Sequence, residues 1–263
     1  MKKIGKYKVI RQLGAGGFGA VYLAEDKLGE QVAIKIFKLR DQDLGQLGSS
    51  MHQRFRDEAR ILRKLSTNPH IVEMYHFDEM EDGTPYYVMP FLEKSLEQEV
   101  GKDAFTAGKL EEIPQHLHPR PAPLSLAVAW LRQILEALEA VHRAGLVHRD
   151  IKPANIMFNS DGRVQLVDFG IAKLPDSEHS ESGVGMGTRY YMSPEQRESA
   201  KHVGAQSDVF SVGVLAYRML TGVMPIGRYR DPVEYVPDLT PEFNQAPSLG
   251  HGTGPEAASR RCG

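Results

Sequence analysis

The pattern of apolar residues changes near Leu92, from the short runs of strands to the spacing of helices. Before that residue, runs rich in β-branched side chains recur between turns, interrupted by one helical stretch at 51–65. These runs are residues 7–10, 20–24, 31–37, 71–77 and 86–89. Strands followed by helices are typical of α+β proteins. We therefore expect an antiparallel sheet with one helix, followed by a mainly helical part.

Two segments after Leu92 have strong helical patterns. Residues 125–144 carry an apolar stripe, and Gly145 provides a stop signal. Residues 208–221 are apolar on nearly every side, which predicts burial inside a lobe. We expect Ser207 to cap this second helix and Gly222 to end it.

Composition excludes several classes of function. The 263 residues carry a formal net charge of -2, which argues against nucleic-acid binding driven by bulk charge. The lone cysteine, Cys262, cannot form an intrachain disulfide and fits a reducing compartment. No apolar run approaches the roughly 20 residues of a membrane span, and no apolar stretch follows the basic first residues. We expect a cytoplasmic protein without a membrane span in this chain.

A glycine-rich motif, Gly14-x-Gly16-x-x-Gly19, lies between two predicted strands. A dinucleotide-binding motif would open a helix at its third glycine, whereas a strand follows here from Val21. The strand favours a hairpin that folds over nucleotide phosphates, because glycines let backbone N–H groups approach the oxygens. Taken alone, the motif is also compatible with a plain turn.

Lys35 lies in the apolar strand 31–37, where an ammonium group needs an anionic partner. Glu58 on the following helix is the natural partner, while Asp57 points about 100° away around the helix. The alternative is an exposed lysine and a solvated glutamate with no contact.

The most specific motif is His148-Arg149-Asp150-x-Lys152-x-x-Asn155, followed by Asp168-Phe169-Gly170. With the glycine-rich motif, Lys35, Glu58, Ser193-Pro194-Glu195 and Asp208 in the same order, it resembles the eukaryotic-like, bacterial-type serine/threonine protein kinase domain. The resemblance extends from about Tyr7 to Gly222. It implies a two-lobed protein kinase-like fold, with an N-lobe at 1–89, a hinge at 90–92 and a C-lobe at 93–222.

The resemblance implies a role for each matching residue. Asp150 would accept the proton of the substrate hydroxyl, and Lys152 would neutralise charge on the γ-phosphoryl group of ATP. Lysine at this second position goes with serine or threonine acceptors in protein substrates. Asn155 and Asp168 would hold Mg²⁺, and Lys35, oriented by Glu58, would contact the α- and β-phosphates.

The resemblance also locates the nucleotide. The glycine-rich hairpin would cover the phosphates with Gly14, Gly16 and Gly19. Adenine would lie against the strand that ends at Met89, beside the hinge residues Pro90 and Leu92. The residues expected above and below the ring are Val21, Ala33 and Met157.

The loop at 171–193 is expected to be regulatory, since Arg149 beside Asp150 marks kinases controlled by phosphorylation of this loop. Ser180 and Ser182 are the preferred autophosphorylation sites, because Thr188 resembles the threonine that contacts the catalytic aspartate and lysine. Phosphorylation in trans would take place in a transient homodimer. A loop that is merely polar is the alternative.

Two segments depart from the family. Residues 101–123 are expected to be an insertion of unconstrained surface, with a partner-binding loop as the alternative. Residues 223–263 lack the further helices of the family, so they are predicted to be loosely ordered and to leave Glu195 without its arginine partner. An ATP-binding pseudokinase or scaffold with an incomplete C-lobe is therefore the alternative function. A small-molecule kinase is disfavoured by Thr188 and Ser193-Pro194-Glu195.

Overall fold

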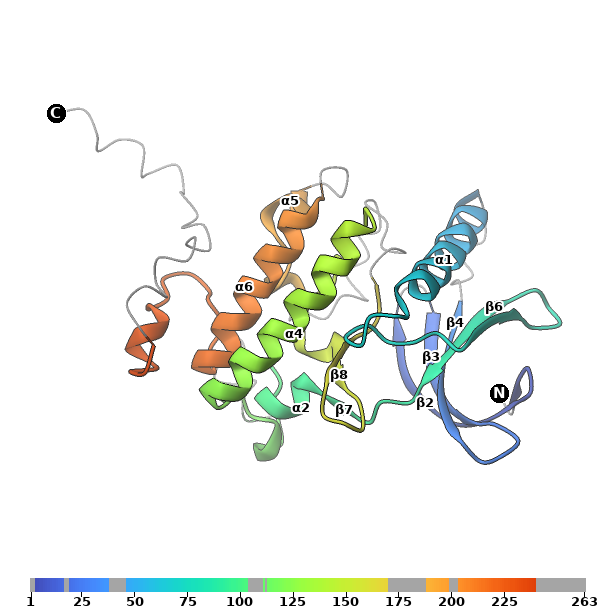
Figure 1. Cartoon of the computed structure of the whole chain (residues 1–263), viewed down its shortest axis with the longest axis horizontal. Coiled ribbons are helices and arrows are strands. Elements are labelled where there is room, and N and C mark those ends of the chain that lie inside the picture. Colours follow the sequence, from blue (N-terminus) through green and yellow to red (C-terminus); the bar gives the residue numbers. More distant parts are fainter. Residues whose placement is uncertain are drawn as a thin grey trace.

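The computed structural model confirms the α+β fold with two lobes (Figure 1). It describes residues 3–16, 19–37, 46–103, 111, 113–169, 188–198 and 203–239. The first lobe is a sheet with one long helix beside it, and the second is mainly helical. The predicted switch from strands to helices therefore coincides with the passage from one lobe to the other.

The first lobe is a six-stranded antiparallel sheet with the order β1-β2-β3-β4-β6-β5. Its strands are β1 (Lys3–Ile4), β2 (Tyr7–Gly16), β3 (Gly19–Glu25), β4 (Gln31–Phe37), β5 (His76–Glu79) and β6 (Pro85–Pro90). The turn between β3 and β4 is built by Asp26, whose carboxylate accepts hydrogen bonds from the backbone N–H groups of Leu28 and Glu30. Such local turn chemistry fixes the register of the hairpins.

The single helix of this lobe, α1 (Gln46–Leu65), begins earlier than predicted but has the predicted inner face. Phe55, Ala59, Leu62 and Leu65 are buried. The Phe55 ring packs against Phe37 of β4 and, at 5.3 Å between centroids, against Tyr87 of β6. This packing fixes α1 against the strands that carry Lys35.

The prediction of a strand at 71–77 was wrong in its position. β5 begins only at His76, and Ile71 instead forms an isolated parallel bridge with Leu166 in the second lobe. The backbone N–H of Val72 donates to Leu166 O, and Leu166 N–H donates to His70 O. The apolar run is thus explained by pairing between the lobes, which sequence patterning did not distinguish from a strand of the first sheet.

The second lobe contains a small sheet, β7-β8-β9, and helices that pack around it. Its elements are β7 (Lys94–Ser95), α2 (Leu96–Val100), η2 (Gln115–Leu117), α4 (Leu124–Arg143), η3 (Pro153–Asn155), β8 (Ile156–Phe158), β9 (Val164–Leu166), η6 (Thr188–Tyr190), α5 (Pro194–Glu198), α6 (Ala205–Thr221) and η8 (Pro232–Glu234). One apolar core extends from Phe37 and Phe55 in the first lobe to Ile134 and Leu215 in the second.

Helices α4 and α6 lie side by side and run antiparallel (Figure 1). Ala122 N–H, before α4, donates to Met219 O near the end of α6, while His142 at the end of α4 contacts Asp208 near the start of α6. α6 is buried along most of its length, as its composition predicts. Gly222 ends it in a left-handed conformation with φ 76°.

The predicted capping role of Ser207 was wrong. The N-cap of α6 is Gly204, and Ser207 lies inside the first turn. Its hydroxyl instead donates a 2.5 Å hydrogen bond to Glu195, on α5. A serine near a helix start satisfies either the helix backbone or a neighbouring carboxylate, and here the tertiary partner takes the hydroxyl.

The prediction of unconstrained surface at 101–123 was also wrong for the parts that the structure describes, 101–103 and 113–123. Lys102 N–H donates to Leu117 O, and Arg120 N–H donates to Val100 O. Gly101 has φ 80°, and a side chain there would collide with the His118 carbonyl. The two ends of the segment are therefore bound to one another and, through Ala122, to α6.

Residues 223–239 cover the end of α6. Met224 is buried, and the rings of Tyr229 and Tyr235 meet Tyr217 edge-on. The Tyr217 hydroxyl donates to Arg230 O at 2.8 Å. The remainder of the predicted loose tail, from residue 240, lies outside the described residues, so that part stays a prediction.

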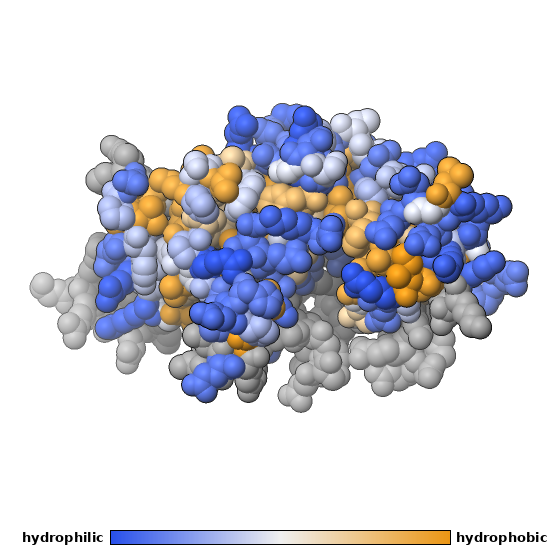
Figure 2. All heavy atoms as spheres, turned by 90° about the horizontal axis from the view of Figure 1, so that it is seen from below, coloured by the Kyte–Doolittle hydropathy of each residue, from blue (hydrophilic) through white to orange (hydrophobic). Residues whose placement is uncertain are grey.

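The face shown in Figure 2 is mostly hydrophilic, with separate patches of apolar side chains. Large apolar residues that are exposed include Leu126, Val128, Leu135 and Val209. Within the described parts of the chain, no helix combines the length and apolarity needed to cross a bilayer.

Candidate active site

The first cluster of charges joins the two lobes. Lys35 projects from β4, and its Nζ lies 2.7 Å from Oε1 of Glu58 on α1 and 2.5 Å from Oδ1 of Asp168, which follows β9. The Glu58 side chain is fully buried, and Oε1 also accepts from the Tyr87 hydroxyl at 2.8 Å. The expected pair of Lys35 and Glu58 is therefore present, and Asp168 extends it into the second lobe.

Burial and charge act in opposite directions in this cluster. Burial lowers the pKa of Lys35, but the charges of Asp168 and Glu58 outweigh it and hold the pKa well above its usual value. Burial raises the pKa of Glu58 despite the attraction of Lys35. Burial also acts to raise the pKa of Asp168, yet the Lys35 charge and hydrogen bond bring it below its usual value. Lys35 is thus a fixed cation beside an ionised Asp168.

The second cluster lies in the loop between α4 and β8. Asp150 is only 7% exposed, and Lys152 Nζ lies 3.1 Å from its Oδ2. Asn155 Nδ2 donates to the same Oδ2 at 2.8 Å and to the Asp150 carbonyl at 2.9 Å. The turn of η3, which begins at Pro153, brings Asn155 back to Asp150. The motif spacing therefore produces one compact group of a carboxylate, an ammonium and an amide.

Asp208 fixes the backbone of this loop. Its buried carboxylate accepts hydrogen bonds of 2.8 Å from the backbone N–H groups of His148 and Arg149. A third contact, also 2.8 Å, joins it to Nε2 of His142. The His148 ring in turn lies 4.6 Å from that of Phe169, and its Nδ1 accepts from the Asp150 N–H at 3.3 Å. α6 thereby fixes the backbone that leads into Asp150.

Two residues in the site adopt backbone angles that are costly for non-glycine residues, Arg149 with φ 67° and Asp168 with φ 62°. The conformation at Asp168 presents a carboxylate that is 47% exposed while Phe169 beside it is buried. Asn155 donates to Asp150 through its amide nitrogen, so the atom that it could offer to a metal ion is its amide oxygen. A carboxylate and an amide oxygen are hard ligands that fit Mg²⁺.

Strand register arranges the residues expected around the nucleotide. One row of paired residues across β3, β4 and β6 consists of Val21, Lys35 and Tyr87. Two positions further along the strands, the next row on the same face consists of Leu23, Ala33 and Met89. Lys35 and Ala33 are two residues apart and so share a face of the sheet. Val21, Ala33 and Met89 therefore lie on the same face as the Lys35 ammonium.

The glycines lie at the end of the same hairpin. Gly16 pairs with Gly19, and Gly14 pairs with Val21. A side chain at Gly19 would collide with the Ile36 carbonyl, whereas no atom of the described residues lies within 4 Å of the position that a side chain at Gly14 would take. Gly19 is thus required by the sheet itself, while Gly14 faces open space.

Other predicted residues are placed by topology alone. Pro90 ends β6 opposite Val32, and Leu92 follows that strand. Met157 belongs to β8 in the second lobe, paired with Ser95 and Gln165. The structure brings Lys35, Glu58 and Asp168 into contact, and likewise Asp150, Lys152 and Asn155. The preferred phosphorylation sites, Ser180 and Ser182, lie outside the described residues, as does the Thr188 side chain.

Sequence reasoning missed Tyr87, the hydroxyl partner of Glu58. It also missed Tyr191, which contacts two distant segments within the second lobe. Tyr87 lies in the apolar run predicted as a strand, but only the register of β6 with β4 places it beside Lys35 and its partner Glu58. Tyr191 donates to Asp103 at 3.0 Å, and its carbonyl accepts from Ser211 at 2.7 Å. No local motif signals these contacts between distant segments.

Comparisons with known proteins agree with this geometry. The family model described as "Protein kinase domain" matches residues 7–244. Serine/threonine-protein kinase pkn2 of Myxococcus xanthus is 39% identical over 229 residues, which are 84% of this chain and 25% of that protein. Serine/threonine-protein kinase PknL of Mycobacterium tuberculosis is 38% identical over 223 residues, or 84% of this chain and 50% of that protein. The chain thus spans a quarter to a half of these relatives.

Among solved structures, the kinase domain of PknI from Mycobacterium tuberculosis is similar with a TM-score of 0.60. At 24% identity, over 90% of this chain and 84% of that one, the likeness concerns the fold. The family match, the order of the motifs along the chain and the two charge clusters lead to one assignment. The chain belongs to the protein kinase domain family.

Proposed function

We propose that this domain transfers the γ-phosphoryl group of ATP to serine and threonine hydroxyls of proteins. The observation that carries the proposal is the contact of Asp150 with Lys152 and Asn155, across from the Lys35, Glu58 and Asp168 cluster. Phosphoryl transfer depends on positioning and on neutralisation of charge more than on covalent help from the protein. These six side chains supply both.

In this proposal Asp150 is the acceptor of the hydroxyl proton. As the substrate oxygen forms its bond to the γ-phosphorus, the bond to the β-γ bridging oxygen breaks, and the proton passes to the Asp150 carboxylate. The other product is ADP, which retains the electron pair of that bond. Lys152, 3.1 Å from Asp150, is close enough to stabilise the charge on the transferred group.

Asn155 and Asp168 are the residues proposed to hold Mg²⁺. When bound, the cation would neutralise charge on the nucleotide phosphates. Asp168 Oδ1 accepts from Lys35 at 2.5 Å in this structure, so a cation and the ammonium would be neighbours on one carboxylate. The lowered pKa of Asp168 supports the role, since a ligand carboxylate must be ionised.

Two features support serine and threonine as the acceptors. Lys152 stands two residues after Asp150, which the family resemblance associates with these hydroxyls. The curated relatives at 38–39% identity carry the name serine/threonine-protein kinase. Autophosphorylation of Ser180 and Ser182, in trans within a transient homodimer, is part of the same proposal.

The test is incubation of the purified chain with γ-labelled ATP, Mg²⁺ and a protein acceptor, followed by acid hydrolysis. We expect label on phosphoserine and phosphothreonine, and none after chelation of the metal. Lys35→Met is the matched control, because it removes the phosphate contact and leaves Asp150 in place. Label on phosphotyrosine, or equal label with Lys35→Met, would overturn the proposal.

A further inference from the structure

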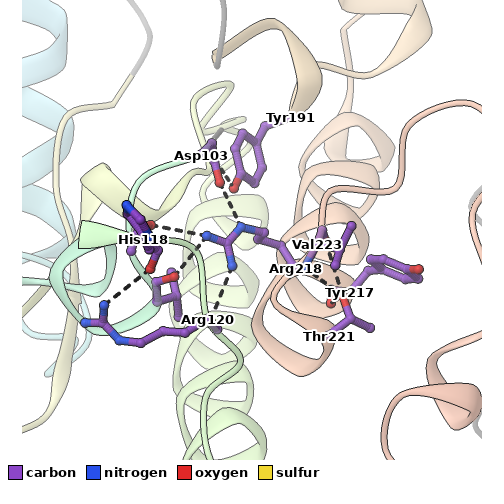
Figure 3. A network of polar contacts seen from close by, with 10 residues as sticks. Asp103, His118, Arg120, Tyr191, Tyr217, Arg218, Thr221 and Val223 are labelled. Atoms are coloured by element: carbon purple, nitrogen blue, oxygen red, sulfur yellow. Dashed lines mark hydrogen bonds and ion pairs between the residues drawn. The ribbon is translucent and has the colours of Figure 1, made fainter. Parts of the chain in front are cut away.

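Arg218 on α6 is a charged side chain in an unusual position, only 1% exposed and the bulkiest of the fully buried residues. A buried guanidinium is costly unless its donors are satisfied. Its Nε donates to Asp103 Oδ1 at 2.8 Å (Figure 3). Nη2 donates to the carbonyls of Val100 and Gly101 at 2.9 and 3.3 Å, and Nη1 to that of Arg120 at 3.4 Å. Arg218 therefore binds both ends of the segment 101–123.

Asp103 divides its two carboxylate oxygens between two elements. Oδ1 accepts from Arg218, and Oδ2 accepts from the Tyr191 hydroxyl at 3.0 Å (Figure 3). Burial, and then the Asp103 charge, raise the pKa of Tyr191 well above its usual value, so the phenol remains a donor. Asp103 thus joins the segment 101–123 to the loop that contains Tyr191.

Tyr191 is held by α6 at both of its ends. Ser211, two turns before Arg218, donates to the Tyr191 carbonyl at 2.7 Å. Arg218 fixes the hydroxyl end through Asp103. The ring itself is 3% exposed. Because Tyr191 is fixed at its backbone carbonyl, its ring and its hydroxyl, the position of the backbone around it is fixed as well.

This backbone connects to the proposed catalytic base. Shortly after Tyr191, Ser193 N–H donates to Gln196 Oε1 at 3.2 Å. Nε2 of Gln196 donates to the Arg149 carbonyl at 3.1 Å, next to Asp150. A continuous series of contacts therefore joins Arg218 and Asp103 to Asp150 through the Tyr191 loop.

We propose that Arg218 and Asp103 form a positioning pair that couples the described ends of this segment, 101–103 and 120–123, through Tyr191 to residues 188–195, where the protein acceptor would bind. In this view the pair sets the affinity for the protein acceptor and leaves ATP binding unchanged. The inference rests on the proposed kinase function and adds that residues 188–195, which include Ser193-Pro194-Glu195, bind the protein acceptor. The glycine-rich hairpin and Lys35, which would bind ATP, have no part in the network among the described contacts.

The most conservative test removes one hydroxyl with Tyr191→Phe. We expect the KM for the protein acceptor to rise about five- to tenfold, as the loss of one buried hydrogen bond suggests, with the KM for ATP unchanged. Asp103→Asn is expected to give a similar rise. Asp103→Asn also removes the charge beside Arg218. The double variant should therefore be no worse than Asp103→Asn alone, because Tyr191→Phe then acts on a link that is already broken.

Tyr217→Phe is the matched control. It removes a tyrosine hydroxyl from α6 that makes a 2.8 Å hydrogen bond to Arg230 O and has no part in the Asp103 link. We expect Tyr217→Phe to lower Tm about as much as Tyr191→Phe does, while the KM for the protein acceptor stays unchanged. An acceptor KM that rises equally in Tyr217→Phe and Tyr191→Phe would assign the effect to general destabilisation and overturn the inference.

Hydrogen exchange provides a readout that does not depend on activity. Tyr191→Phe and Asp103→Asn should speed exchange of the amides at 189–197 and leave those of β4 unchanged. If the wild-type chain transfers no phosphate, the proposed function fails, yet exchange at 189–197 still tests the coupling. Unchanged exchange there in both variants would contradict it.

Discussion

At the scale of single residues, Glu58 illustrates how burial and charge compete in the site. The Glu58 carboxyl is fully buried beside Lys35, and burial raises its pKa above the usual 4.5. A carboxyl group with a raised pKa binds its proton more tightly in the folded state than in the unfolded chain. The ionised group therefore costs stability, which is the sign opposite to that of Asp168, whose pKa is lowered.

This contrast predicts a pH dependence for Glu58→Gln. As the pH rises from 4.5 through the raised pKa of Glu58, the wild type loses stability that the amide variant keeps. The difference in the free energy of unfolding should change by about 1.4 kcal/mol for each unit by which the pKa is raised. Urea unfolding of both proteins across this range measures it. A difference that does not vary with pH would contradict the assignment.

Residues within one short segment were the most predictable part of the site. Asp150, Lys152 and Asn155 lie on one loop, so their spacing alone brings them together. Contacts between distant segments were not predictable in the same way. The Tyr87 hydroxyl reaches Glu58 only because β6 pairs with β4 in one register, and Asp103 meets Arg218 across 115 residues.

At the scale of elements, we expect the stability of the fold to depend on the inner face of α4. Ile134 is fully buried in the large apolar core, whereas its neighbour Leu135 is 50% exposed. Ile134→Ala should lower the free energy of unfolding by about 2–5 kcal/mol, because a cavity remains. Leu135→Ala on the outer face should change it by less than about 0.5 kcal/mol. Equal costs in chemical denaturation would refute the assigned faces.

The glycine-rich hairpin gives a second prediction at this scale. Gly19→Ala places a methyl group against the Ile36 carbonyl, so it should lower Tm as well as activity. At Gly14 no atom in the described parts of the chain lies within 4 Å of the added carbon, so Gly14→Ala should leave Tm nearly unchanged. We expect Gly14→Ala instead to raise the KM for ATP, since the methyl group would meet the phosphates. A fall in Tm for Gly14→Ala equal to that for Gly19→Ala would show the space to be filled.

Helix boundaries and strand types were predicted where one periodicity dominates. The stripe of α4 and the apolar α6 fall close to their expected positions. The run at 71–77 and Ser207 were misassigned because their roles depend on partners in another element, Leu166 and Glu195. A local pattern records burial but not the identity of the neighbour.

At the scale of the whole molecule, the site exists only where the two lobes meet. Lys35 and Glu58 come from the first lobe and Asp168 from the second, and the ion pair between Lys35 and Asp168 crosses the boundary. Backbone pairing of Val72 with Leu166 crosses it a second time. The nucleotide would lie between the lobes, so ligand binding and lobe position are linked.

The linkage predicts a thermal shift. ATP with Mg²⁺ should raise the Tm of the wild-type chain by several degrees, since a ligand bound only to the folded state stabilises it. In Asp168→Asn the shift should be largely lost, because the ion pair with Lys35 and a proposed metal ligand are both removed. Scanning calorimetry with and without nucleotide measures this. A full shift in the variant would exclude Asp168 from the metal site.

The most direct test of the account compares nucleotide binding with phosphoryl transfer in Asp150→Asn. The amide keeps the size of the side chain but cannot take the hydroxyl proton. We predict a single-turnover rate of transfer to a serine acceptor about 10²- to 10⁴-fold below that of the wild type, with the Kd for ATP unchanged. Transfer at the wild-type rate would contradict the central claim that Asp150 is the catalytic base of a serine/threonine kinase.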